Sequence, residues 1–305
     1  MKKKLLFLII VFLIVYILFF PSYAVQAAGS GLVLWYERVL PALLPFSILS
    51  NILIYSDCLP CLTGLLAPLL QKVLPVSEEG AFIVCSGFLF GFPMGSKNCA
   101  ELLKMNKISF EEAEILFIIT NNISPVFISS YILESELKLS GCVGFSLLIL
   151  YLPALLLGEY LLAHRKNVDF SHKKTTSRSK INFQIIDAGI MNGFETLTRI
   201  GGYIVLFSIL TSMIQHLPLP ELLKIILTGL TEITNGIHYL TYTDLSKEYR
   251  YILAMAFTAF GGISGLAQTS SMVKDTKLSM KKYICFKLLL TIISATLAFV
   301  LTLLI

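Results

Sequence analysis

Long apolar stretches separated by short polar loops dominate the chain. Six of them approach or exceed the ~20 residues that an α-helix needs to cross ~30 Å of hydrocarbon. They lie at 31–56, 109–133, 139–163, 184–217, 247–272 and 283–305. Residues 5–20 form a further apolar run behind the basic start Met-Lys-Lys-Lys. The pattern predicts an all-α polytopic membrane protein.

Three further stretches are too short or too interrupted to cross cleanly, at 60–75, 79–106 and 221–245. The second and third carry glycine, proline or polar residues in their middles. Irregular backbone at membrane depth is tolerated only where protein or a water-filled cavity covers it. The pattern therefore predicts two re-entrant helical hairpins, each entering and leaving on one side, and an interfacial segment at 60–75.

The distribution of basic residues predicts the topology. Lysine and arginine outnumber acidic residues in the linker 164–183 and in the loop around Lys274 to Lys282. Both loops fall in the cytoplasm, as the positive-inside rule requires, if neither hairpin crosses. The first hairpin then enters from the cytoplasm, the second from outside, and the C-terminus lies outside. Residues 1–28 are either a retained first helix, with a cytoplasmic N-terminus, or a cleaved signal peptide.

Composition narrows the class. The chain is 56% hydrophobic and only 14% charged, whereas soluble domains average ~25% charged residues. The net charge of +5 resides in loops, so the expected partner is the lipid bilayer and not nucleic acid. Cys58-Leu-Pro-Cys61 has no second pair, so we expect no metal site. With no nucleophile–base pair, an enzyme is not expected.

Two halves of the chain resemble each other, at 29–163 and 184–305. Phe-Ser-Ile-Leu occurs at 46–49 and again at 207–210, and Asn-Asn-Ile-Ser at 121–124 has a counterpart in Gly-Gly-Ile-Ser at 261–264. One predicted hairpin lies between these motifs in each half. Because the hairpins enter from opposite sides, the repeats are predicted to be inverted, which is typical of secondary transporters with a midplane substrate site. Arg38 and Arg199 precede the two Phe-Ser-Ile-Leu segments and are expected to anchor at opposite membrane surfaces.

The middle of the first hairpin, Gly-Phe-Pro-Met-Gly-Ser-Lys, is a candidate substrate-binding tip. Glycines permit the turn, proline stops the first helix, serine can cap the second, and lysine adds a cation. Free N–H groups at such a helix start attract anions. The candidate residues are Gly91, Phe92, Pro93, Gly95, Ser96 and Lys97. A kink that only fits its neighbours is the alternative.

The second hairpin offers Gly-Leu-Thr-Glu-Ile-Thr-Asn-Gly at 229–236. A carboxylate at membrane depth is costly unless it is paired, hydrated or neutral, so Glu232 is the sharpest candidate for holding substrate or a coupling proton. Thr231, Thr234 and Asn235 add hydrogen-bonding groups. The alternative places Glu232 near the outer headgroups as a solvated loop residue.

Two spans carry polar residues beside helix-breaking ones. Asn121, Asn122 and Ser124 precede Pro125, which kinks a helix and frees a carbonyl. In the counterpart Phe-Gly-Gly-Ile-Ser-Gly-Leu-Ala-Gln, Ser264 and Gln268 lie one turn apart. Both faces are expected to line a cavity, with interhelical packing as the alternative.

Three motifs of the chain together resemble the sporulation integral membrane protein YlbJ family, also called stage V sporulation protein V. They are Arg-Val-Leu-Pro-Ala-Leu-Leu-Pro-Phe-Ser-Ile-Leu, Gly-Phe-Pro-Met-Gly-Ser-Lys and Ile-Thr-Asn-Asn-Ile-Ser-Pro. That family belongs to the nucleoside-recognition, or Gate, domain group. The layout is more distantly similar to concentrative nucleoside transporters. In those transporters the first hairpin tip resembles Gly-Gln-Thr-Glu, whereas this chain has Gly91-Phe92-Pro93-Met94 and lacks the acidic residue. Their second tip has an Asn-Glu pair, and the corresponding residues of this chain are Thr231 and Glu232.

The resemblance implies a secondary transporter of a small anion, with dipicolinate crossing the outer forespore membrane during sporulation as the expected cargo. The missing acid and the presence of Lys97 favour an anion over a nucleoside. Two alternatives stay open: an ion-coupled nucleoside-type transporter, and a non-transporting Gate-domain protein of spore maturation or assembly. No cofactor is expected beyond a coupling proton or Na⁺, and an oligomer is left open.

Overall fold

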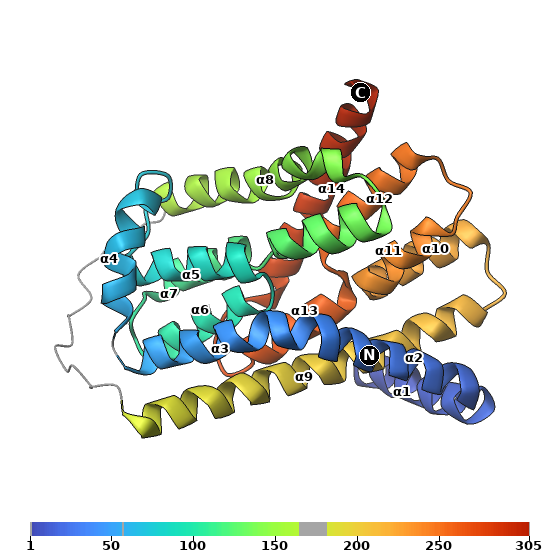
Figure 1. Cartoon of the computed structure of the whole chain (residues 1–305), viewed down its shortest axis with the longest axis horizontal. Coiled ribbons are helices and arrows are strands. Elements are labelled where there is room, and N and C mark those ends of the chain that lie inside the picture. Colours follow the sequence, from blue (N-terminus) through green and yellow to red (C-terminus); the bar gives the residue numbers. More distant parts are fainter. Residues whose placement is uncertain (1, 57, 165–181, 305) are drawn as a thin grey trace.

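The computed structural model describes residues 2–56, 58–164 and 182–304, and within these ranges every regular element is a helix (Figure 1). The all-α prediction is confirmed. The first half contains α1 (Lys2–Phe19), α2 (Pro21–Leu34), the π-helical turn η1 (Trp35–Val39), α3 (Leu40–Tyr55), α4 (Leu59–Leu70), α5 (Glu78–Phe90), α6 (Met94–Lys104), α7 (Phe110–Ile119), the π-helix η2 (Phe127–Glu136), the 3₁₀ turn η3 (Ser140–Cys142) and α8 (Val143–Ala163).

The second half contains α9 (Phe183–His216), α10 (Glu221–Thr231), α11 (Ile233–Thr241), α12 (Lys247–Phe260), α13 (Gly262–Val273) and α14 (Met280–Leu304). Almost all of the predicted basic linker 164–183 lies outside the described residues. The predicted boundary at residue 28 falls inside α2.

Five helical stretches of the described chain are long and apolar enough to cross a membrane, at Pro21–Tyr55, Ser140–Ala163, Phe183–His216, Lys247–Val273 and Met280–Leu304. They confirm a multi-pass integral membrane protein. The stretch at 109–133 is not among them, because α7 ends at Ile119 and η2 begins only at Phe127. Residues 121–124 are not helical, and Pro125 stands at the first helical position after them, where its missing N–H would have no helical partner.

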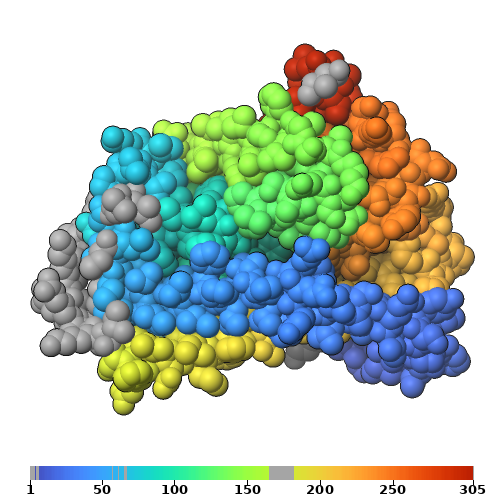
Figure 2. Space-filling view, viewed as in Figure 1, coloured from blue at the N-terminus to red at the C-terminus, as the bar shows by residue number. Residues whose placement is uncertain are grey.

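Two short helical hairpins lie at opposite ends of the molecule with their tips directed toward its middle (Figure 1). They are α5–α6 and α10–α11. Alongside them, the long helices α2–α3 and α9 run side by side along one edge, and α8 follows the other (Figures 1 and 2). The hairpins match the segments predicted at 79–106 and 221–245.

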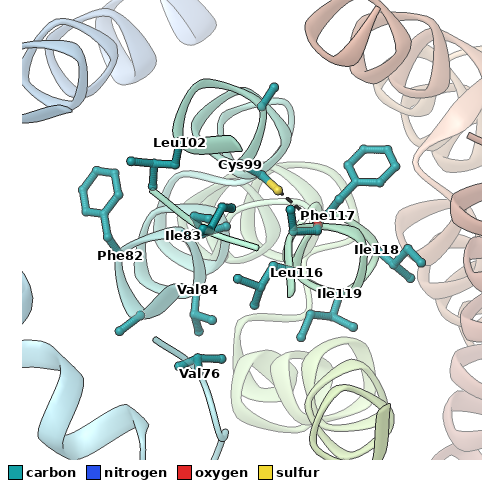
Figure 3. Packing of buried hydrophobic residues seen from close by; sticks show 14 of the residues in the cluster. Val76, Phe82, Ile83, Val84, Cys99, Leu102, Leu116, Phe117, Ile118 and Ile119 are labelled. Atoms are coloured by element: carbon teal, nitrogen blue, oxygen red, sulfur yellow. Dashed lines mark hydrogen bonds between the residues drawn. The ribbon is translucent and has the colours of Figure 1, made fainter. Parts of the chain in front are cut away.

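The first hairpin is held by an apolar core shared with α7 (Figure 3). Ile83 on α5, Leu102 on α6 and Phe117 on α7 are fully buried there. The Cys99 thiol donates to the carbonyl oxygen of Ala113 at 3.2 Å, so this cysteine acts as a small packing residue. The packing fixes where the hairpin tip lies.

In each hairpin, the two helices cross at a pair of glycines. A Cβ atom at Gly95 would lie 3.1 Å from the Cα of Gly87, and one at Gly236 would overlap the Cα of Gly229. The two helices of each hairpin therefore approach with backbone against backbone, which side chains larger than hydrogen prevent. The same device in both halves supports the internal repeat.

Gly236→Ala is expected to lower the free energy of unfolding by roughly 1–3 kcal/mol, the cost of overpacking a tight contact. Thermal unfolding followed by intrinsic fluorescence in detergent measures the effect. Gly64→Ala on α4 is the matched control, because a Cβ there meets no atom within 4 Å. It should leave stability unchanged or raise it slightly. Equal losses in both variants would contradict the proposed close crossing.

Candidate functional site

The tip of the first hairpin lies against the break between α7 and η2. Gly91 has φ +78° and turns the chain after α5. The next N–H, that of Phe92, donates to the carbonyl oxygen of Asn122 at 2.6 Å. A Cβ at Gly91 would lie 2.5 Å from the backbone nitrogen of Ser124. Position 91 therefore requires glycine for two reasons: its positive φ, and the close approach of its backbone to that of Ser124.

The tip of the second hairpin lies against the break between α12 and α13. Glu232 separates α10 from α11, and its Oε2 caps α11 by accepting from the N–H of Asn235 at 2.8 Å and from the hydroxyl of Thr234. Gly261 and Gly262 form the break, both with positive φ. A Cβ at Gly262 would lie 3.3 Å from the carbonyl oxygen of Thr231. Each tip thus packs on the helix break of its own half.

The two tips, the break between α7 and η2, and Gln268 on α13 line one cavity of about 400 Å³. Phe92 spans the halves, because its ring lies 3.2 Å from where a Cβ at Gly265 would be. The polar and aromatic lining residues are Glu37, Arg38, Phe90, Phe92, Ser124, Phe127, Ser130, Tyr131, Ser135, Glu232, Thr234 and Gln268. The volume lies within the range of small-molecule sites.

Hydrogen bonds hold the polar wall of the cavity in place. The hydroxyl of Tyr131 donates to the carbonyl oxygen of Thr234 at 3.2 Å, which links η2 to α11. Gln268 Nε2 donates to Ser264 Oγ at 3.2 Å on α13. Glu232 is 4% exposed, so its carboxylate faces a largely enclosed space. The cavity offers hydrogen-bond acceptors, an amide and four aromatic rings.

Arg38 brings a cation to this cavity, contrary to its expected role as a surface anchor. It lies in η1, where the N–H of Leu40 donates to the carbonyl oxygen of Trp35. Trp35 Nε1 donates to the carbonyl oxygen of Leu197 at 2.8 Å. This contact puts the η1 turn beside the segment of α9 that holds Arg199. The two arginines therefore lie near one level of the helix pair and not at opposite surfaces.

Lys97 does not line the cavity. It is 4% exposed, and its Nζ donates to Ser47 Oγ on α3 at 3.0 Å. The neighbouring Ser96 lies on another face of α6, where its hydroxyl donates to Asn121 Oδ1 at 3.0 Å. The cation predicted for the first tip is thus directed away from the cavity.

A buried polar network lies behind the first tip. Asn121 Nδ2 donates to Thr269 Oγ1 at 2.7 Å and to the hydroxyl of Tyr283 at 2.8 Å. Lys287 Nζ on α14 donates to Asn122 Oδ1 at 3.0 Å. Lys287 is 2% exposed. The network joins α6, the α7–η2 break, α13 and α14, and it fixes the backbone carbonyl that holds the first tip.

The predicted site residues therefore separate into groups. Five of them line the cavity: Phe92, Ser124, Glu232, Thr234 and Gln268. Ser96, Asn121 and Asn122 belong to the network behind it, whereas Gly91, Pro93, Gly95, Thr231 and Ser264 shape the tips and breaks. Asn235 borders a second hollow of about 390 Å³ on the other side of α11, where its Nδ2 lies 3.4 Å from Ser208 Oγ.

One curated protein matches the chain over most of its length. The chain is 27% identical to the sporulation integral membrane protein YlbJ of Bacillus subtilis over 307 aligned positions, which cover 88% of the chain and 75% of that protein. The chain is therefore similar to a YlbJ protein over most of its length. No protein-family profile matches it, and no solved structure matches it.

Arg38 and Lys287 were not among the predicted site residues, although each has a signal in the sequence. Arg38 and Arg199 stand at the same offset ahead of the repeated Phe-Ser-Ile-Leu, in the middle of apolar spans. Lys287 interrupts the apolar run of the last span. An ionisable residue inside a membrane span is a functional candidate by default.

Asn98 was missed as well. It follows Lys97 on α6, is fully buried, and has no hydrogen-bond partner for either side-chain polar atom. Buried amides of this kind normally bind water or another polar group. In the sequence, Asn98 is distinguished only by its position next to the predicted tip of the first hairpin.

Proposed function

We propose that this chain is a secondary transporter that carries a small organic acid, with dipicolinate as the expected cargo, during spore formation. The observation that carries the proposal is a cavity lined by both hairpin tips, by the first helix break and by Gln268 of α13. The family relationship to a sporulation membrane protein supports the biological setting. The cargo rests on the chemistry of the cavity together with the resemblance to the YlbJ family.

The architecture supports alternating access. At 1.5 Å per residue, the 13 residues of α5 and the 11 of α6 span about 20 and 16 Å. Neither crosses ~30 Å of hydrocarbon, so we propose that α5–α6 and α10–α11 are re-entrant. Their entry from opposite ends makes the two halves inverted repeats around a midplane site.

The charges in the cavity suit an aromatic acid. Arg38 can bind a carboxylate through two parallel N–H donors, and Phe92 or Tyr131 can pack against a planar ring. Glu37 and Glu232, which also line the cavity, would repel a carboxylate in a space of low dielectric. We therefore propose that a proton accompanies the anion, held at Glu232 or on the cargo, in preference to Na⁺.

Uptake of labelled dipicolinate and labelled uridine into proteoliposomes tests the proposal. Arg38→Gln is expected to reduce dipicolinate uptake about tenfold, the loss of roughly 1.5 kcal/mol from a charge-assisted hydrogen bond. Lys97→Met is the matched control, because Lys97 faces α3 and should leave uptake within about twofold.

Two other uptake results would lead to a different function for this protein. Uptake of uridine in place of dipicolinate would assign the cavity to a nucleoside, for which Glu232 and Gln268 would hold hydroxyl groups. No uptake of either compound by folded protein would favour the non-transporting role in spore assembly.

A further inference from the structure

Charged residues occupy the exposed face of α9 near its midpoint. The helix has 34 residues and is about 51 Å long, well beyond the ~30 Å hydrocarbon layer. Arg199 lies near its centre, so a layer of that thickness encloses Arg199 wherever the helix crosses it, and Glu195 lies one turn away toward the start of the helix. The side chains of Glu195 and Arg199 are 62% and 40% exposed and form an ion pair with each other.

The same face carries small and polar neighbours. Thr198 is exposed between the two charges. A Cβ at Gly202, one turn further on, would meet no atom within 4 Å. These positions share one stripe of the helix, since residues three and four apart are neighbours. The opposite stripe is occupied, because Gly193 packs on Ile48 and Gly201 on Trp35.

The exposed apolar side chains of Met191 and Leu206 continue this stripe on either side of the charges. The charges distinguish it from the open faces of α14 and α8, whose most exposed large side chains are apolar, such as Ile292 at 65% and Leu148 at 57%, and suit lipid. Charged residues at membrane depth instead face protein or a water-filled cavity. Neither of the two cavities described above is lined by Glu195, Thr198 or Arg199. Figure 2 shows α9 open to the outside along one edge.

We propose that this stripe of α9 (Glu195, Thr198, Arg199 and Gly202) is the contact through which copies of this chain self-associate in the membrane. Charge complementarity identifies the occupant. Copies related by rotation about the membrane normal bring parallel α9 helices together. Glu195 of one copy then lies about one helical turn from Arg199 of the next, within reach of these long side chains. The two intrahelical pairs join into a network of four charges.

Small residues in the stripe favour the same arrangement. Gly202 and Thr198 allow two helix backbones to approach closely, as small residues do in membrane helix pairs. The hydroxyl of Thr198 can donate across the contact. The proposal depends on membrane insertion and not on transport, so it goes beyond the proposed function.

The oligomeric state in lipid nanodiscs, measured by native mass spectrometry of the full chain, tests the contact. Wild type is expected to be oligomeric, and Glu195→Leu/Arg199→Leu is expected to be at least tenfold less associated. The double variant removes both charges together, so neither is left unpaired and folding is retained. A wild type that stays monomeric, or a double variant that associates as wild type does, would overturn the proposal.

Cross-linking gives an independent measurement. Thr198→Cys, in a chain whose own cysteines are replaced by alanine, is expected to form a disulfide-linked dimer on oxidation in membranes. Ile292→Cys on α14 is the control, since that side chain is more exposed but lies on a lipid-facing stripe. Cross-linking at Ile292 that equals or exceeds that at Thr198 would place the contact elsewhere. Uptake by either variant reports separately on the transport proposal.

Discussion

Asn121→Leu is expected to lower the free energy of unfolding by roughly 3–5 kcal/mol, because it removes three hydrogen bonds between buried polar groups at once. Ser96, Thr269 and Tyr283 each lose the hydrogen bond that Asn121 makes with them. All three side chains are buried within the protein, so water replaces these bonds poorly. Denaturant unfolding in mixed micelles, followed by circular dichroism, measures the loss.

Asn235→Leu provides a matched control for this prediction. It is also an asparagine beside a hairpin tip, but its side chain is half-buried and its contact with Ser208 is long, at 3.4 Å. We expect a cost below about 1 kcal/mol. If both leucine variants lost the same stability, the network behind the first tip would not be what fixes that tip.

Glu232→Ala is expected to reduce substrate uptake by about 30- to 150-fold. The carboxylate caps α11 and faces the cavity, so its removal forfeits a charge-assisted hydrogen bond of roughly 2–3 kcal/mol in the transport cycle. Loss of the cap should in addition lower stability by about 1 kcal/mol. Proteoliposome uptake and thermal unfolding of the same preparation separate the two effects.

Two further variants sharpen the test of Glu232. Glu232→Gln keeps an oxygen that can cap α11 but cannot carry a proton, so stability should return while proton-dependent uptake does not. Glu221→Gln, at the exposed start of the same hairpin, should leave both unchanged. Full uptake by Glu232→Gln would remove this residue from the coupling mechanism.

Glycine and proline carried most of the information about the architecture. Gly91, Pro93 and Pro125 interrupt apolar runs, and Gly261 with Gly262 does the same in the second half. Such residues disfavour continuous helix whatever surrounds them. The hairpins and broken helices could therefore be located from the sequence within a few residues. Long apolar runs located the spans for an equally local reason.

The direction of individual side chains could not be predicted in the same way. Successive residues on a helix point about 100° apart, so Ser96 and Lys97 face different neighbours although both stand at the first tip. Neither side chain lines the cavity, because of how α6 packs against α3 and α7. That packing involves contacts between residues far apart in the sequence, such as Lys97 with Ser47.

The position of Arg38 at the cavity could not be predicted, because it depends on a π-helical turn. The sequence Trp-Tyr-Glu-Arg-Val does not indicate such a turn, and regular α-helical spacing would place Arg38 on another face of the helix. Lys287 is different, since a lysine inside an apolar span is visible in the sequence alone. Its partner Asn122 was a predicted site residue, but pairing them required the fold.

The η1 turn has an evolutionary consequence. A π-turn is an α-helix with one residue inserted, and such bulges are frequent at functional sites. Deleting one residue from this turn would restore regular α-helical hydrogen bonding, and α2 and α3 would keep the faces that they present to α9, because the wider turn takes up the extra residue locally. Only the residues inside the turn, Glu37 and Arg38 among them, would change the direction in which they point. Loss of one codon in this turn could therefore alter the charge at the cavity wall without repacking the long helices.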